Sequence, residues 1–171
     1  MTRMYFANNI MVETAHDDQP EHPRNHDGSI CALHFWPKVA RKYASLRDEP
    51  RQGTADDFIL FPLYMYLHSD VAFSTFDFND PYDSWQAGSV FVYKQRVREK
   101  FGWKRITKQR MGLIRLAVHN ELSELADFCN GYTYLLYVYK NHELFDIVTG
   151  FYGESAAINW ACDAYSTQED Q

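Results

Sequence analysis

The stretch YTYLLYVYKNHELFDIVT, residues 132–149, does most to decide the fold. Its two arms, 132–139 and 144–149, are rich in aromatic and aliphatic side chains, and they flank the polar residues Lys140 to Glu143. Two such arms around a short polar turn predict a β-hairpin. The chain is therefore expected to contain antiparallel strands.

Helix signals lie on both sides of this hairpin. Before it, Thr107 is a candidate N-cap residue, and Asn130-Gly131 predicts the helix end. The apolar positions between them recur at helical spacing and predict one buried face: Met111, Ile114, Val118, Leu122 and Leu125. After the hairpin, residues 153–165 predict a last helix and 166–171 a frayed tail.

The first two thirds of the chain predict mostly strands and loops. Thr54 is a candidate cap of a short helix, which should stop near Phe61 because Pro62 disfavours helical geometry in the residue before it. Tyr93, Val97 and Phe101 predict another short helix, ended by Gly102. We expect strands at 4–14, 30–36, 63–67, 71–76 and 89–93, a polar loop at 15–28, one or two weak helical turns within 38–53, and a turn-rich loop at 79–88.

This irregular mixture of strands and helices indicates the α+β class, because regular βαβ alternation is missing. We predict a single domain over residues 1–171, with a mainly antiparallel sheet and two or three packed helices. The cysteines Cys31, Cys129 and Cys162 are widely spaced, as in reduced structural thiols. The longest apolar run, 58–67, is too short to span a bilayer, so we expect a soluble, cytoplasmic protein without membrane association.

Charge is distributed unevenly along the chain. The net charge of the chain is −6, yet residues 94–115 carry nine basic residues and one acid, a net of +8. The remainder therefore sums to −14. A field this polarised steers partners more than it shapes a fold.

The basic stretch has two interpretations. It is either a solvated face that pairs with acids elsewhere on the chain, or a patch that contacts phosphates or an acidic protein. In the second case Lys94, Arg98, Lys104, Arg105 and Lys108 supply the charge, and Trp103 is an aromatic anchor. The acidic remainder weakens the nucleic-acid version, since phosphates repel it.

The acidic residues suggest a different surface. Asp77, Asp80 and Asp83 line a turn-rich segment with Asp70 nearby, and Glu121, Glu124 and Asp127 lie on one helix. Ordinary solubilising charge explains any one of them. Together they match a surface that enters an Arg-rich or Lys-rich groove of a partner.

The catalytic and metal signals are weak. His68-Ser69-Asp70 does not predict a triad, because neighbouring side chains of an extended strand point to alternate sides. A pair of His68 with Asp83 or Asp80 remains an acid/base candidate. His16, His22 and His26 are better explained as a solvated loop than as a metal site. We therefore predict no catalytic residue, no metal and no cofactor.

The block from Leu60 to Arg110 resembles an uncharacterised family of small proteins of phages, plasmids and conjugative elements. That family's pattern is LPLYLYDHSG, then CPWDSGQVG, then VRKEYGxKRISK, and this chain has FPLYMYLHSD, DPYDSWQAG and VREKFGWKRITK. The later NELSELADFCNGYTYLLYV and GFYG are similar to the family's C-terminal part. At five positions this chain has another residue than the family pattern: Leu67 instead of Asp, Asp70 instead of Gly, Asp80 instead of Cys, Tyr82 instead of Trp and Trp85 instead of Gly.

The resemblance implies a mobile-element context, in which small acidic proteins often disarm host defences. The leading hypothesis is a non-enzymatic protein that inhibits a host nucleic-acid-directed defence effector, of the anti-CRISPR or antirestriction type. A nucleic-acid-binding accessory protein and a small hydrolase or transferase around His68 are the alternatives. The expected partner-binding residues are Asp70, Asp77, Asp80, Tyr82, Asp83, Trp85, Trp103, Lys104, Arg105 and Lys108.

Overall fold

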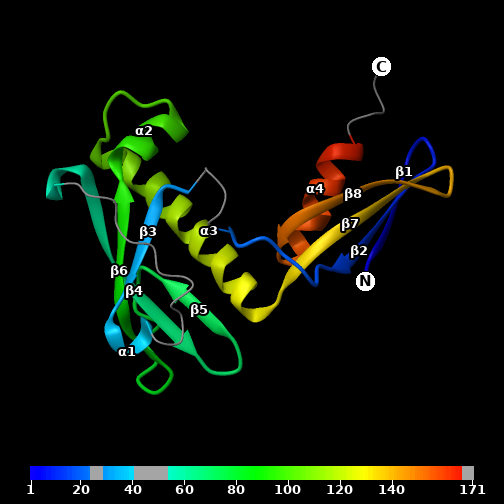
Figure 1. The fold of residues 1–171 in the computed structure, drawn as a ribbon. Coiled ribbons are helices and arrows are strands. Elements are labelled where there is room, and N and C mark those ends of the chain that lie inside the picture. The colour runs from blue at the N-terminus through cyan, green and yellow to red at the C-terminus, as the bar shows by residue number, and fades with distance from the viewer. Residues whose placement is uncertain (24–28, 41–53, 167–171) are drawn as a thin grey trace. The chain divides into compact units, whose positions relative to one another are not determined.

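The computed structural model describes residues 1–23, 29–40 and 54–166 (Figure 1). The α+β class is confirmed, and every strand pair in this described part is antiparallel. The strands are β1 (Arg3–Phe6), β2 (Ile10–His16), β3 (Cys31–Phe35), β4 (Phe58–Leu67), β5 (Val71–Ser74), β6 (Ser84–Tyr93), β7 (Thr133–Lys140) and β8 (Glu143–Tyr152). The helices are α1 (Pro37–Ala40), η3 (Ala55–Asp57), α2 (Lys94–Phe101), η4 (Lys108–Arg110), α3 (Met111–Asn130) and α4 (Glu154–Ser166).

The strands form two sheets, where the sequence predicted one. Sheet A has the order β1-β2-β7-β8, and sheet B has the order β3-β6-β4-β5. The chain divides into two compact units: unit 1 is residues 1–25 with 127–171, and unit 2 is residues 26–126. The pairing of β2 with β7 joins segments far apart in the sequence, which local patterns do not reveal. The assignment of 1–171 to one domain stays a prediction.

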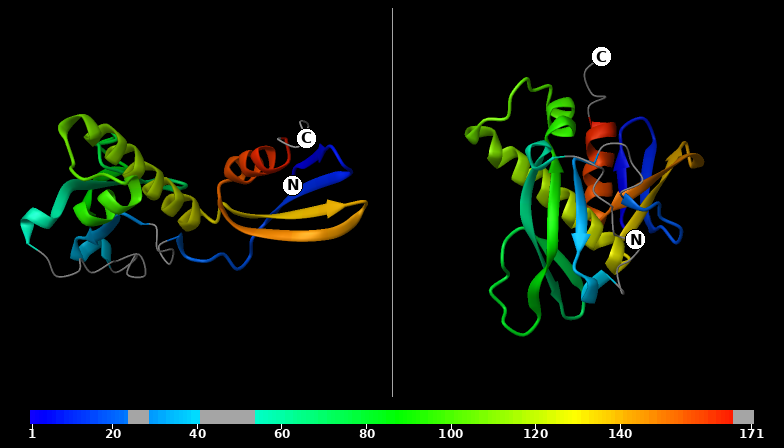
Figure 2. Two further views of the ribbon diagram at one scale, coloured as in Figure 1. Left: turned by 90° about the horizontal axis from the view of Figure 1, so that it is seen from above. Right: turned by 60° about the vertical axis from the view of Figure 1, so that its left-hand side comes forward.

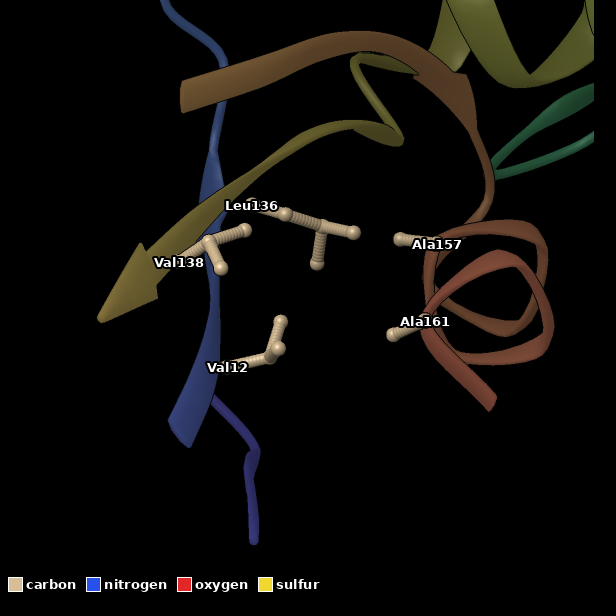
Figure 3. Packing of buried hydrophobic residues seen from close by; sticks show 5 residues of the cluster. All are labelled: Val12, Leu136, Val138, Ala157 and Ala161. Carbon is tan, nitrogen blue, oxygen red and sulfur yellow. The ribbon is translucent and has the colours of Figure 1, made fainter. Parts of the chain in front are cut away.

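Unit 1 is sheet A with α4 along one face (Figure 2). Val12 of β2 and the neighbouring Leu136 and Val138 of β7 point toward Ala157 and Ala161 of α4 (Figure 3). All of them are essentially inaccessible to solvent. Small alanines let the helix approach the sheet closely, so this unit has a compact core made from both ends of the chain.

Two hairpin turns lie side by side in unit 1. Asn141 and His142 both have positive φ between β7 and β8, so the predicted hairpin is confirmed. Asn8 and Asn9 also have positive φ, and they split the predicted 4–14 strand into β1 and β2. Asn tolerates this conformation, which makes it a turn residue inside an otherwise alternating segment. The Asn9 side chain donates a hydrogen bond to Asn141 Oδ1 at 3.2 Å.

Unit 2 is sheet B with α3 packed on it. The predicted helix face is confirmed, with Ile114, Val118, Leu122 and Leu125 fully buried. The Arg115 guanidinium lies 4.8 Å from the Phe61 ring of β4. The predicted α2 is also confirmed, and Gly102 ends it with φ +64°.

Two boundaries in unit 2 differ from expectation. The helix after Thr54 ends at Asp57, and β4 begins at Phe58 instead of beyond Pro62. Because β5 pairs only with 64–67, β4 is an edge strand at Pro62, where a missing N–H is tolerated. The turn-rich loop is also shorter than predicted, since β6 already begins at Ser84.

Several N-terminal predictions fall partly outside the described residues. β2 runs to His16, so the polar loop begins at Asp17 and not at Ala15, and residues 24–28 of it lie outside the described part. The weak helical turns predicted within 38–53 correspond to α1 as far as Ala40, and 41–53 lie outside. The last helix is confirmed as α4. Of the predicted frayed tail only Ser166 is described, and it is the last residue of α4.

Candidate interaction surfaces

The predicted partner-binding side chains separate into two groups at opposite ends of sheet B. The ten-residue strands β4 and β6 run antiparallel, with Tyr66 opposite Ser84 and Phe58 opposite Tyr93 (Figure 1). We call residues 68–85 the acidic end and residues 94–110 the basic end. The strand length places them about 30 Å apart, at about 3.3 Å per residue. Asp70, Asp77, Asp80, Tyr82, Asp83 and Trp85 belong to the acidic end, and Trp103, Lys104, Arg105 and Lys108 to the basic end.

The carboxylates of the acidic end build its loop. Asp80 Oδ1 accepts hydrogen bonds from the backbone N–H groups of Tyr82 and Asp83, both at 2.9 Å. These bonds, from Asp83 first and then Tyr82, lower the pKa of the Asp80 carboxyl. Asp77 Oδ1 accepts from the Asn79 N–H at 2.9 Å in the same way. The loop is therefore held in one shape by its own acids.

His68 and Asp83 form a pair across the start of this loop. The ring Nδ1 of His68 lies 2.9 Å from Asp83 Oδ2, and the Leu67 N–H donates to the Asp83 carbonyl at 2.8 Å. The predicted contact of His68 with Asp83 is thus confirmed. The two side chains are 69% and 35% exposed. The pair is an open dyad at the surface, and exposed pairs of this kind add about 1 kcal/mol or less to stability.

Exposed aromatic rings lie beside these acids. Tyr82 is 89% exposed, Phe76 62% and Trp85 39%. Sequence reasoning missed Phe76, because it assigned this residue to the end of a strand, whereas β5 stops at Ser74. The Arg115 guanidinium lies 5.5 Å from the Phe76 ring and supports it from α3. Tyr82 and Trp85 therefore share one end of the sheet with the acids, whereas Phe76, which contacts Arg115 as Phe61 does, lies closer to the middle of β4.

At the basic end, aromatic side chains pack on each other. The Phe101 and Trp103 rings stack at 4.5 Å with an interplanar angle of 16°, and the Arg110 guanidinium lies 4.7 Å from the Trp103 ring. Arg110 also donates to the Arg105 carbonyl at 2.6 Å. Trp103 is therefore engaged within its own unit, and its expected role as an aromatic anchor stays a prediction.

Other cations of the segment hold the fold. Lys94 donates to the Asp56 carbonyl at 2.6 Å, and Arg96 donates to the Ser29 carbonyl at 2.9 Å. In contrast, four basic side chains are exposed and form no side-chain hydrogen bond or ion pair with another described residue: Arg98, Lys104, Arg105 and Lys108.

The sequence suggested that Glu121 belongs to an exposed acidic face of a helix, but the structure shows that it does not. Its side chain is only 12% exposed and lies 3.6 Å from Lys100 Nζ. It accepts hydrogen bonds from the Ser29 hydroxyl at 2.7 Å and from the Ile30 N–H at 2.8 Å. Its role is to fasten the entry of β3 to α3. Sequence spacing gave no signal for these contacts, because residues 29–30 and 121 are distant in the chain.

The remaining chemistry-bearing groups show no assembled site. Cys31 is buried, and burial raises the pKa of the half-buried Cys129 to about 11. Within the described residues, no three His, Cys, Asp or Glu side chains are grouped so as to hold a metal ion, and His26 lies outside them. No helix in the described part has the length and apolarity needed to cross a membrane.

Comparisons with known proteins add no relative. No protein-family model matches the chain, and neither the curated proteins nor the solved structures contain a match.

Proposed function

We propose that the chain is a non-enzymatic binding protein whose acidic end occupies the basic nucleic-acid channel of a host defence effector. The observation that carries this proposal is the position of exposed aromatic rings beside carboxylates on one pre-formed loop. Tyr82 is 89% exposed and lies two residues after Asp80, and Phe76, which is 62% exposed, directly precedes Asp77. Tyr and Trp are enriched among the few residues that dominate the binding energy of protein interfaces, and carboxylates select a basic partner.

The loop geometry supports binding because the loop is already ordered in the free protein. Asp80 accepts hydrogen bonds from the backbone N–H groups of Tyr82 and Asp83, and Asp77 accepts one from the Asn79 N–H. A rigid loop loses less conformational entropy on association than a flexible one. The choice of a nucleic-acid-directed effector rests on the mobile-element context that the resemblance implies.

Affinity purification against CRISPR effectors and restriction enzymes tests the proposal. The full chain should retain an effector, and nucleic acid should compete for it. Tyr82→Ala with Phe76→Ala should weaken retention at least tenfold, whereas Tyr5→Ala with Phe145→Ala, at rings of unit 1 that are 74% and 66% exposed, should not. The proposal is contradicted if the chain retains no effector and does not protect an infecting phage from host defence.

An enzyme is the second candidate, favoured by the 2.9 Å contact of His68 with Asp83. A carboxylate that orients an imidazole is the arrangement of a general base. In this case His68→Ala would abolish the biological effect while the protein stays folded. Full activity of a folded His68→Ala protein would remove this candidate.

A further inference from the structure

Four exposed cations of the basic end that form no ion pair with a described residue make a second surface, which the proposed function does not use. Arg98 lies on the last turn of α2, Lys104 and Arg105 lie in the segment after it, and Lys108 begins η4. None of them has an ion-pair partner among the described residues. Glu99 is the only acid within 94–110.

The backbone under these cations is held firmly. The Trp103 N–H donates to the Arg98 carbonyl at 2.9 Å, directly after the left-handed Gly102. Arg110 covers Trp103 and bonds the Arg105 carbonyl, so the segment is fixed from both sides. The cations therefore project from an ordered frame, and less entropy is lost when they bind.

The acids nearest this end face other cations: Glu121 lies 3.6 Å from Lys100, and Asp57 feels the charge of Lys94. The acidic end of the same sheet is about 30 Å away, several times the Debye length of about 8 Å at physiological salt. Unit 2 holds 14 Lys and Arg against 12 Asp and Glu, a net of +2. Unit 1 holds 3 against 11, a net of −8, so the negative charge of the chain belongs chiefly to unit 1.

We propose that the basic end binds the phosphate backbone of a nucleic-acid duplex without reading its sequence. Backbone contacts need only positioned cations, whereas single-strand binding uses free aromatic rings on which bases stack. Phe101 and Trp103 stack on each other and Trp103 is covered by Arg110, so neither offers an open platform. An acidic protein partner would also need an aromatic or apolar anchor, which these same rings do not provide.

A salt titration of duplex binding tests this surface in the full chain. The probe is a labelled random-sequence DNA duplex of about 20 base pairs, followed by fluorescence anisotropy between about 50 and 200 mM salt. We expect weak binding whose association constant falls steeply with salt. In a plot of log K against log salt concentration, the slope should be about −0.9 for each contacted phosphate. Lys104→Gln with Lys108→Gln should reduce that slope by about 2.

The matched control removes the same charge elsewhere. Lys38→Gln with Lys140→Gln changes two exposed lysines outside the basic end and should leave the slope unchanged. Three results would overturn the proposal: no binding by the unchanged protein at low salt, an equal loss in the control, or displacement of the duplex by polyglutamate as effectively as by unlabelled duplex at equal charge. Tyr82→Ala should not affect duplex binding, so this proposal and the proposed function fail separately.

Discussion

The two ends of sheet B use their charges in opposite ways. At the acidic end, Asp77 and Asp80 bond the backbone of their own loop, and Asp83 contacts His68. At the basic end, an aromatic stack and Arg110 build the frame, and four exposed cations form no ion pair with a described residue. A count of charges does not show which charged side chains are already engaged in contacts within the protein. The hydrogen bonds show that the acids shape a loop that exposes Tyr82, whereas the cations remain available for a partner.

The largest expected effect comes from breaking the sheet between the ends. In Gly88→Ala the new Cβ would lie 1.9 Å from the backbone oxygen of His34 in β3, and neither strand has room to move. We expect a loss of about 3 kcal/mol in the free energy of unfolding, measured by urea denaturation. Gly112→Ala is the matched control: nothing lies within 4 Å of that Cβ, so helix propensity should add about 0.5–1 kcal/mol. Equal stability of the two variants would contradict this geometry.

A smaller loss should follow when the basic end is detached from β3. Glu121→Ala removes the acceptor of the buried Ile30 N–H and the partner of Lys100. An unsatisfied buried donor together with lost charged bonds predicts about 2–3 kcal/mol of destabilisation in the same urea experiment. Glu124→Ala changes an exposed acid of the same helix, where a surface contact is worth about 1 kcal/mol or less, so its loss should be clearly smaller. Indistinguishable midpoints would show that Glu121 does not fasten β3.

Acid should act on the acidic end without disturbing the frame of the basic end. The pKa of Asp80 is lowered in the folded protein, so its loop contribution is present above the ordinary Asp value of 3.8 and is lost as pH falls through the lower folded value. The amide NMR signals of Tyr82 and Asp83 should shift together below about pH 4. Those of Trp103 and Arg105 should stay in place, because Lys and Arg keep their protons there. Tyr82 and Asp83 signals that titrate above that range would refute the bonding of Asp80.

The smallest effect is expected from the exposed dyad. His68→Ala removes its contact with Asp83, and we expect the free energy of unfolding to change by less than about 1 kcal/mol because water competes for both groups. Thermal unfolding of the variant beside the unchanged protein measures this. A much larger loss would mean that the dyad, and not Asp80, holds the loop.

Local patterns predicted what depends on neighbours in the sequence. The β7–β8 hairpin, the buried face of α3 and the Gly102 helix end all follow from residues a few positions apart. The sequence missed the pairing of β2 with β7 and the bonds from Glu121 to residues 29–30, because these join distant segments. It also did not show where the acidic and basic residues lie relative to each other, since only the strand register places them at opposite ends of β4 and β6.

If the two ends of sheet B act as separate surfaces, duplex DNA should affect the NMR signals of only one of them. Amide signals of the isotope-labelled full chain are followed at about 50 mM salt, where phosphate contacts are strong. We expect shifts for residues 98–110 and none for residues 68–85. Shifts throughout residues 68–85, or no shift in residues 98–110, would contradict this separation.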